Sequence, residues 1–299
     1  MGTVVRTPSH EKKNPQIPIR SMIICPEDCY LVNFDLAQAE SWLVAYLANE
    51  YTMKHVLATG DFHRETGQKA LFKESDEHWE LAPKEERKTK RYVGKRYNHA
   101  TAYRMGPQRA CEVINKDSDK PPFVTVTHAE SKVFYKSWHD YYNIQGWWNE
   151  IEYQLNETRT LRTPYDRIRY FFAPWGPELF REATAYVPQS TVADHMDGAI
   201  QEGVNGPGGV IEVHRQFVKT GMIRIINQSH DSILCEIPRT SCLTICEQIV
   251  KLLLRPLVVN DEEFTIPVDC EIGFRWGELH EQLRPMGSYE IEYELPEAA

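Results

Sequence analysis

NQSHDSILCEI, residues 227–237, sets a histidine and an aspartate directly before an alternating apolar run. The run is typical of a strand, and a charged residue at the start of a strand needs a reason. A buried aspartate costs free energy unless a positive charge or a cation meets it. A second carboxylate has the same setting, because Asp35 follows the apolar residues of CYLVNFDL (29–36). We therefore expect Asp35 and Asp231 to lie at one edge of one sheet.

The remaining chain alternates between helical and extended patterns, which favours a mixed α/β or α+β fold. Asp61 is expected to cap the second helix. Helices are expected at 37–60, 85–105, 180–204 and 242–254, and helical segments near 128–157. A further helix is expected to start within 61–72, and another to follow the loop at 203–209 and end at about 220. The expected extended segments are a hairpin or turn at 159–171, two strands within 221–238, and a last strand at 265–276. Residues 1–20 are expected to form an irregular arm and Lys120-Pro121-Pro122 a loop.

The composition is that of a globular protein with a real core, since 41% of the 299 residues are hydrophobic. No run reaches the roughly 18 apolar residues of a membrane span, so no membrane is predicted. The first 16 residues lack the apolar core of a signal peptide, and the 7 cysteines include no C-x-x-C pair. These features predict reduced thiols in a cytoplasm. The net charge of -9, taken alone, argues weakly against nucleic-acid binding.

Two aspartates on neighbouring strands can hold divalent cations through hard oxygen ligands. Two metal ions about 3.5–4 Å apart would support an in-line phosphoryl or nucleotidyl displacement. The alternative is that each aspartate only caps a turn, which is the commoner role of a single aspartate at a strand end. The pair alone does not decide between these readings.

The segment 85–105 adds a second signal, because Arg91, Lys95, His99 and Tyr103 recur every four residues. Residues spaced by four stay near one face of a helix. Arginine offers a fork and lysine a point charge to phosphate oxygens, and a tyrosine ring can stack on a base. A solvated basic face is the alternative, but the interleaved aromatic residues and the strand-end aspartates favour a triphosphate site.

Together these segments resemble three motifs of the family A DNA polymerases, the group of bacterial DNA polymerase I and many phage replicases. FDLAQAESWLVAYLA resembles motif A, KRYVGKRYNHATAYRMG resembles motif B, and QSHDSILCE resembles motif C. Weaker similarities lie in NPQIPIR, GDFHRETG, REATAYVPQSTVADH and GFRWGEL. The segments occur in the family's order and cover nearly the whole chain.

The resemblance implies an α+β fold, in which a right-hand polymerase palm (an antiparallel sheet with packed helices) carries a helical fingers insertion. It implies a first palm part with motif A at 1–48, fingers with motif B at 49–180, and a second palm part with motif C at 181–299. Family members carry a thumb and usually an exonuclease domain before this region. We expect either a split polymerase whose thumb and exonuclease functions lie on a separate chain, or a truncated remnant.

The resemblance also assigns roles to individual residues. Asp35 and Asp231 match the metal aspartates, which would hold two Mg²⁺ ions, with Mn²⁺ as a possible substitute. The residues implied to contact the incoming nucleotide are Gln38, Glu40, His63, Arg91, Lys95, His99 and Tyr103. The residues implied to contact DNA are Arg181, Gln189, Gln228 and His230.

Several positions depart from the family pattern. His99 replaces the usual aromatic residue of motif B, which should alter stacking on the incoming base. Arg104 replaces the glycine after the motif B tyrosine, Trp42 replaces the arginine of motif A, and Ala185 replaces an asparagine. Ser232 replaces the last acid of motif C, so two of the usual three carboxylates remain.

These observations predict a DNA-directed DNA polymerase that acts on primer-template DNA and dNTPs. One alternative is a catalytically inactive nucleic-acid-binding or assembly subunit derived from such a polymerase. Another is a metal-dependent nuclease, which would use both aspartates but would not need the Arg-Lys-Tyr helix. The expected location is the cytoplasm, or the host cytoplasm if a phage encodes the chain.

Overall fold

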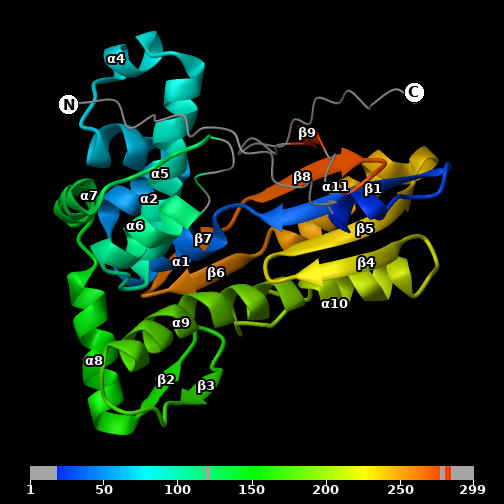
Figure 1. The fold of residues 1–299 in the computed structure, drawn as a ribbon. Coiled ribbons are helices and arrows are strands. Elements are labelled where there is room, and N and C mark those ends of the chain that lie inside the picture. The colour runs from blue at the N-terminus through cyan, green and yellow to red at the C-terminus, as the bar shows by residue number, and fades with distance from the viewer. Residues whose placement is uncertain (1–18, 117, 119–121, 277–279, 284–299) are drawn as a thin grey trace. The chain divides into compact units, whose positions relative to one another are not determined.

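The computed structural model of the chain describes residues 19–116, 118, 122–276 and 280–283 (Figure 1). These residues divide into two compact units. The first unit comprises Ser41–Leu161 and Ile168–Pro188, and the second comprises Arg162–Arg167 with the described parts of Asn14–Glu40 and Gln189–Ala299. The expected arm at 1–20 lies almost entirely outside the described residues, as do Lys120 and Pro121 of the expected loop.

The second unit is built on a five-stranded antiparallel sheet (Figure 1). The strands, in sheet order, are β4 (Arg224–Ser229), β5 (Ser232–Pro238), β1 (Cys29–Leu36), β8 (Val268–Gly273) and β9 (His280–Leu283). β1 is the central strand, and buried and partly exposed side chains alternate along its second half. Val32, Phe34 and Leu36 are fully buried in the core, so the period of two turns Asp35 to the opposite, partly exposed face.

Helices cover the apolar face of the sheet. α11 (Cys242–Leu253) packs on β5 and α10 (Gly209–Val213) through residues spaced three or four apart, among them the buried Ile245 and Ile249. The shorter elements of this unit are η1 (Ile19–Met22), the π-helix η3 (His214–Val218), η4 (Arg239–Ser241), and the hairpin of β6 (Pro256–Val259) and β7 (Glu262–Thr265). All seven cysteines are free thiols, in agreement with the sequence-based expectation.

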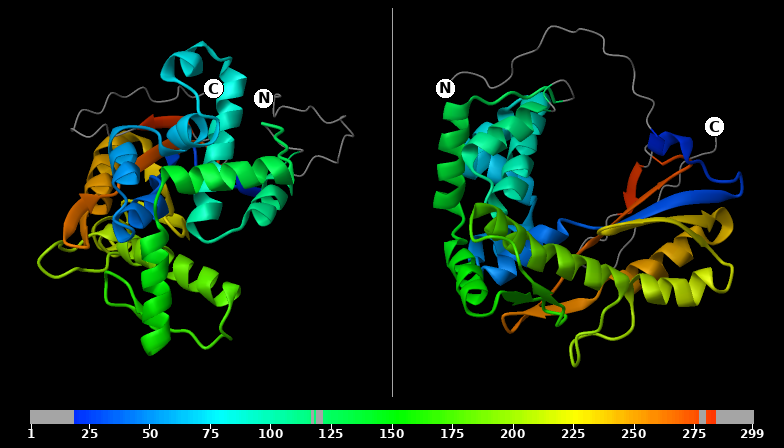
Figure 2. Two further views of the ribbon diagram at one scale, coloured as in Figure 1. Left: turned by 90° about the vertical axis from the view of Figure 1, so that its left-hand side faces the viewer. Right: turned by 60° about the horizontal axis from the view of Figure 1, so that its bottom comes forward.

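The first unit is mainly helical. Its helices are α1 (Ala39–Leu47, which begins in the second unit), α2 (Tyr51–Thr59), α3 (Phe62–Glu65), the π-helix η2 (Thr66–Leu71), α4 (Asp76–Leu81), α5 (Lys84–Ala102), α6 (Pro107–Lys116), α7 (His128–Tyr141) and α8 (Gln145–Thr158). α9 (Pro177–Asp197) crosses from the first unit into the second. The two long helices α8 and α9 are drawn in green in Figure 2. The short strands β2 (Thr160–Arg162) and β3 (Ile168–Tyr170) precede α9.

Two glycines let α5 approach the preceding helices closely. A Cβ on Gly94 would lie 2.3 Å from the carbonyl oxygen of His63, and a Cβ on Gly67 would lie 2.3 Å from that of Lys90. Neither contact leaves room for a side chain, so this backbone approach requires glycine. The approach sets His63 of α3 beside the middle of α5.

The expected element boundaries are partly wrong. The helix expected at 37–60 breaks in two, because Asn49 adopts a positive φ of 49° and Glu50 caps α2 through Met53 N. The helix expected at 180–204 ends at Asp197, where Gly198 has a φ of 108°. The β6–β7 hairpin was not expected, and β9 follows the strand that was expected to be last. In the described part of the chain no helix is long and apolar enough to cross a membrane.

Candidate active site

Asp35 and Asp231 lie at the same end of two neighbouring strands in the second unit. β1 and β5 pair in a register that ends with Asp35 opposite Ser232. One step further, the amide of Leu36 donates a hydrogen bond to the carbonyl oxygen of Asp231 at 2.9 Å. The expectation that both aspartates lie at one edge of one sheet is therefore confirmed.

The chemistry of this donor set suits Mg²⁺. Within the described residues, no group of three or more His, Cys, Asp or Glu side chains is placed to hold a metal ion. Mg²⁺ is usually held by one or two carboxylates together with substrate phosphates, and not by an all-protein cage. Two neighbouring carboxylates fit that mode of binding.

Asp269 is a neighbour of Asp35 that the sequence did not suggest. β1 also pairs with β8, and this register sets Asp269 directly opposite Asp35. Residues directly opposite on an antiparallel pair point to the same face. Asp35 is therefore flanked by Ser232 on one strand and by an acid on the other. The position of Asp269 depends on strand register, which the sequence alone does not reveal.

Glu40 and His230 are in contact beside the two aspartates. His230 Nε2 lies 3.2 Å from Glu40 Oε1, and the hydrogen bond to Glu40 raises the pKa of His230. Glu40 is in the first turn of α1, and His230 directly precedes Asp231. The contact therefore joins the segments that carry Asp35 and Asp231, which are far apart in the sequence. The contact fixes the direction of the Glu40 carboxylate.

Gln38 and His230, which lie near the two aspartates in the sequence, have a backbone conformation that residues other than glycine rarely adopt. Gln38 has a φ of 55° and His230 a φ of 51°. The side-chain oxygen of Gln38 is also buried, and among the described residues it has no hydrogen-bond partner. Strained residues and unsatisfied polar atoms are typical of functional sites, where a ligand completes the contacts.

The residues expected to contact DNA lie on α9, on β4 and in the turn between β4 and β5. Gln228 on β4 donates through Nε2 to Asp197 Oδ1 at 2.5 Å. Arg181 and Gln189 are both exposed on α9, eight residues apart. Gln228 therefore lies close to the end of α9, and Arg181 and Gln189 remain accessible along it.

In the first unit, one face of α5 carries the expected basic residues. Arg91, Lys95 and His99 are all exposed, whereas Val93, Gly94, Tyr97 and Asn98 are buried. Arg91 is held in place by Asp61, because Arg91 Nε donates to Asp61 Oδ2 at 2.5 Å. Burial favours a raised pKa for Asp61, but the hydrogen bonds from Arg91 and from Arg64 N outweigh it and lower the pKa. Asp61 also caps α3, as expected.

His63 is a neutral hydrogen-bonding group and not a cation. It is buried, and burial together with a smaller effect of the neighbouring His99 lowers its pKa to about 3. Asn98 fixes its tautomer: the Asn98 Oδ1 accepts hydrogen bonds from Trp138 Nε1 and from Thr66, so Asn98 Nδ2 faces His63 Nδ1 at 3.1 Å. The ring proton of His63 is thereby assigned to Nε2.

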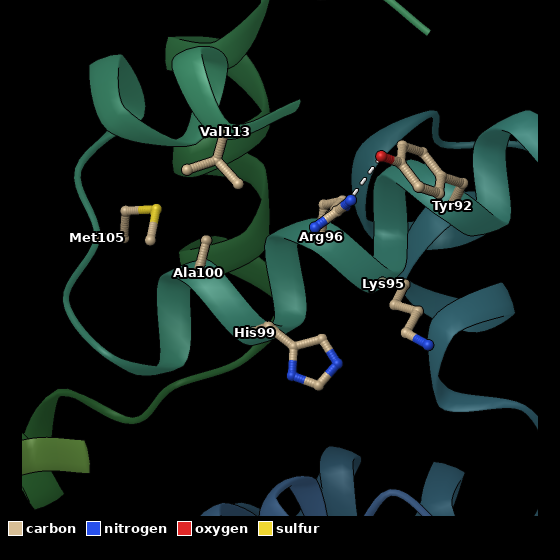
Figure 3. A pocket seen from close by; sticks show the side chains of 7 residues that line it. All are labelled: Tyr92, Lys95, Arg96, His99, Ala100, Met105 and Val113. Carbon is tan, nitrogen blue, oxygen red and sulfur yellow. Dashed lines mark hydrogen bonds between the residues drawn. The ribbon is translucent and has the colours of Figure 1, made fainter. Parts of the chain in front are cut away.

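A pocket of about 410 Å³ opens beside the basic face of α5 (Figure 3). Lys95 and His99 project from the same side of the helix, and Arg96 donates a hydrogen bond to the Tyr92 hydroxyl at 3.0 Å. The remaining lining residues are apolar: Ala100, Met105 and Val113. A cationic rim over an apolar floor suits a ligand that has both charge and a flat apolar part.

Tyr103 was expected on the same helical face, but it lies beyond the end of α5. The helix ends at Ala102, and Tyr103 is its C-cap. The next residue, Arg104, has a φ of 60°, a conformation that cannot continue the helix and that glycine adopts more readily than arginine. Arg104 offsets the strain with hydrogen bonds to Thr184 Oγ1 at 2.9 Å, to Trp148 O at 2.7 Å, and to Glu152.

Comparison with known proteins shows the family of the chain. The family model described as DNA polymerase family A matches residues 6–278, and the chain belongs to that family. It is 25% identical to the DNA polymerase I of Helicobacter pylori strain 26695 and 24% identical to that of strain J99. Each alignment covers 92% of this chain but 29% of the relative, so the chain spans less than a third of these polymerases.

A solved structure shares the fold. It is described as the POL domain of Pol1 from M. smegmatis in complex with DNA primer-template and dNTP. The TM-score is 0.67 at 18% sequence identity, over 86% of this chain and 42% of that one. The α+β polymerase fold expected from the sequence is confirmed.

Proposed function

We propose that this chain is the catalytic part of a template-directed DNA polymerase, which transfers a nucleotide from a dNTP to a primer 3′-hydroxyl. The observation that carries the proposal is the meeting of Asp35 and Asp231 at one end of the β1–β5 pair. Membership of DNA polymerase family A supports it, as does the exposed basic face of α5. Primer-template DNA and dNTPs, which the similar solved structure is described as containing, are the proposed substrates here too.

Asp35 and Asp231 would hold two Mg²⁺ ions, for which Mn²⁺ could substitute. Their carboxylate oxygens are the hard ligands that Mg²⁺ prefers, and two carboxylates leave coordination positions for substrate phosphates. When bound, the two ions would lower the pKa of the primer 3′-hydroxyl and offset the charge of the triphosphate and the leaving pyrophosphate. Asp269 would add negative charge beside Asp35, from the strand that flanks β1 on the side away from β5.

Arg91 and Lys95 would bind the β and γ phosphates, Arg91 through its planar fork and Lys95 as a point charge. Asp61 occupies Arg91 in the structure, so a triphosphate would replace a carboxylate as the partner of Arg91. His63 would donate its Nε2 proton to a phosphate oxygen without adding charge. His99, Tyr103 and Gln38 would complete the contacts to the base and sugar of the nucleotide.

Arg181, Gln189, Gln228 and His230 would contact the primer end or the minor groove, where acceptor atoms are shared among base pairs. The thumb and exonuclease functions of a separate chain, the cytoplasmic location and a phage origin remain predictions. Duplex binding should weaken as salt rises, because phosphate contacts release counterions.

Glu40 would exclude a ribose 2′-hydroxyl by its bulk, held in direction by His230. Glu40→Ala should therefore raise the incorporation of ribonucleotides relative to deoxynucleotides by about tenfold or more, since a pocket of matched size rejects an added group by roughly that factor. Primer extension with each nucleotide class measures the ratio. Glu40→Gln, which keeps the size, is the matched control and should stay selective. An active Glu40→Ala variant with unchanged selectivity would refute the assignment.

A further inference from the structure

Asn98 lies at the centre of a buried hydrogen-bond network in the first unit. Its side chain is on α5, and its partners come from α3, from the π-helix η2 and from α7. The network comprises five buried residues: His63, Thr66, Asn98, Trp138 and Tyr142. A buried polar network whose members satisfy one another holds a single arrangement. The direction of each side chain can therefore be read from its partners.

Trp138 decides which way the Asn98 amide faces. An indole N–H can only donate, so the Asn98 atom that lies 2.9 Å from Trp138 Nε1 is the oxygen. The amide nitrogen Nδ2 therefore faces His63 Nδ1, at 3.1 Å. Thr66 Oγ1 also lies 2.9 Å from the Asn98 oxygen and 3.0 Å from the Tyr142 hydroxyl. The orientation of Asn98 is thus set from α7, forty residues further along the chain.

This orientation of Asn98 disfavours two of the three forms that His63 can take. Because Asn98 Nδ2 is a donor, His63 Nδ1 has to accept, which keeps the proton of the neutral ring on Nε2. The other neutral tautomer and the protonated ring would both set an Nδ1–H against a second donor at 3.1 Å. Burial acts in the same direction, since it is the largest cause of the low pKa of His63. His63 is left with one group for a ligand, a neutral Nε2–H donor.

His63 lies beside the basic face of α5. The ring centroids of His63 and His99 are 5.6 Å apart. The other charged groups that act on the His63 ring are Asp61, Arg91 and Lys95. The closeness of α3 to α5 is fixed by the backbone, because the crossing at Gly94 leaves no room for a side chain. An anion bound at this face would therefore meet a neutral donor next to the cations.

We infer that Asn98 is a positioning residue for nucleotide binding, which holds His63 as an Nε2–H donor for a triphosphate oxygen and is itself oriented by Trp138. The inference rests on the proposed polymerase function, which supplies the dNTP. A histidine that could exchange tautomers would turn a lone pair toward the anion for part of the time. The network removes that state, so the donor is in place before the nucleotide arrives.

The test reverses the polarity of this contact with Asn98→Asp, which keeps the size of the side chain. A carboxylate favours a proton on His63 Nδ1, so the neutral ring would turn the lone pair of Nε2 toward the phosphate, whereas the protonated ring would donate from both nitrogens. At about pH 8 the variant should bind dATP about tenfold or more weakly than the wild type, the loss expected for a hydrogen bond to a charged group. At about pH 5.5 protonation restores the donor, so the loss should shrink to about threefold or less.

Fluorescence titration with dATP measures both affinities, and the ratio of variant to wild type at each pH cancels the titration of the nucleotide and of His99. Asn149→Asp, at an exposed asparagine on α8, adds the same charge outside the network and should bind as the wild type does. His63→Leu should lose about tenfold at both pH values, because no donor remains. His63→Gln, which keeps an N–H donor, should recover most of that loss.

Nitrogen NMR of the imidazole rings determines the tautomer of the wild type without any nucleotide. The His63 signals, identified by their absence in His63→Gln, should show the Nε2–H form from about pH 5.5 to 8. An Nδ1–H or protonated His63 in this range would overturn the inference. So would a loss of affinity in Asn98→Asp that is equal at both pH values. The proposed function fails separately, if the wild-type chain binds dATP with these properties but does not extend a primer.

Discussion

Arg91 forms a salt bridge with Asp61, and a nucleotide that bound to Arg91 would have to displace this carboxylate. The side chains of Arg91 and Asp61 are 45% and 35% exposed, and such pairs contribute about 0.2–1 kcal/mol. The salt bridge therefore keeps Arg91 in one direction at little cost in free energy. It also means that Asp61 would compete for this guanidinium with the triphosphate that we propose as its ligand.

Asp61→Asn should tighten the binding of a dNTP by up to about fivefold, which corresponds to the small free energy of an exposed pair. The asparagine still caps α3, so the fold should persist. Nucleotide titration followed by fluorescence measures the affinity. Asp76→Asn is the matched control, because Asp76 bonds to Gln68 and not to Arg91. A weaker affinity in Asp61→Asn would mean that Asp61 orients Arg91 for phosphate and does not compete with it.

At the scale of single residues, the position of a residue at a strand end could be predicted from the sequence. The partners that orient its side chain could not. The shared position of Asp35 and Asp231 at one end of two neighbouring strands was predictable from the apolar residues beside them. The tautomer of His63 was not, because it depends on Asn98, whose amide is oriented by Trp138 forty residues away. Asp269 was missed because its neighbour is set by strand pairing and not by spacing in the sequence.

At the scale of elements, the end of α5 depends on Arg104. Its guanidinium joins α8 and α9 through Trp148, Glu152 and Thr184, and its positive φ ends the helix. Arg104→Ala removes these bonds and keeps the strain, so it should lower the free energy of unfolding by about 2–4 kcal/mol.

Urea denaturation of Arg104→Gly and Arg104→Ala separates the two contributions. Glycine relieves the positive φ, so Arg104→Gly should be more stable than Arg104→Ala by about 1 kcal/mol. Arg109→Ala, whose side chain is 68% exposed, should change stability by less than about 0.5 kcal/mol. Equal stability of the wild type and Arg104→Ala would contradict the role given to this residue.

The end of α9 should make stability depend on pH. Burial, with a smaller effect of Arg255, lowers the pKa of His195 from 6.5 to about 4. Between these values the unfolded chain binds a proton that the folded chain does not, so stability is present above about pH 6.5 and is lost as the pH falls toward 4.

His195→Leu should flatten this slope of stability against pH, measured as urea midpoints from about pH 7 to 4.5. Tyr165→Phe is the matched control: it removes the 2.6 Å hydrogen bond to His195 Nδ1 but keeps the histidine. It should lower stability by about 1 kcal/mol and leave the slope in place. A steep slope that persists in His195→Leu would assign it to other groups.

Most elements could be predicted from periodicity and end signals, and the failures have local causes. The break between α1 and α2 was missed because no glycine or proline marks it, and Asn49 supplies the positive φ instead. The β6–β7 hairpin was missed because its strands are four residues long, too short for a clear alternation. The close approach of Gly67 and Gly94 requires tertiary packing to be seen at all.

At the scale of the whole molecule, the net charge of -9 was a poor guide to nucleic-acid binding. It argued against nucleic-acid binding, yet the chain belongs to DNA polymerase family A. Positive charges are concentrated locally on α5, the helix that we propose to bind phosphate. Family membership was predictable because three motifs in order survive substitutions such as His99 and Ser232.

Primer extension on a primer-template with Mg²⁺ and four deoxynucleotides is the most direct test of the proposed activity. We predict that the wild-type chain extends the primer, that Asp231→Ala abolishes extension, and that Asp166→Ala, at an exposed aspartate, does not. Duplex binding should survive in Asp231→Ala, because that residue is proposed to hold metal and not DNA. Extension that persists in Asp231→Ala would contradict the account, and a wild-type chain that binds duplex without extending it would favour an inactive DNA-binding subunit.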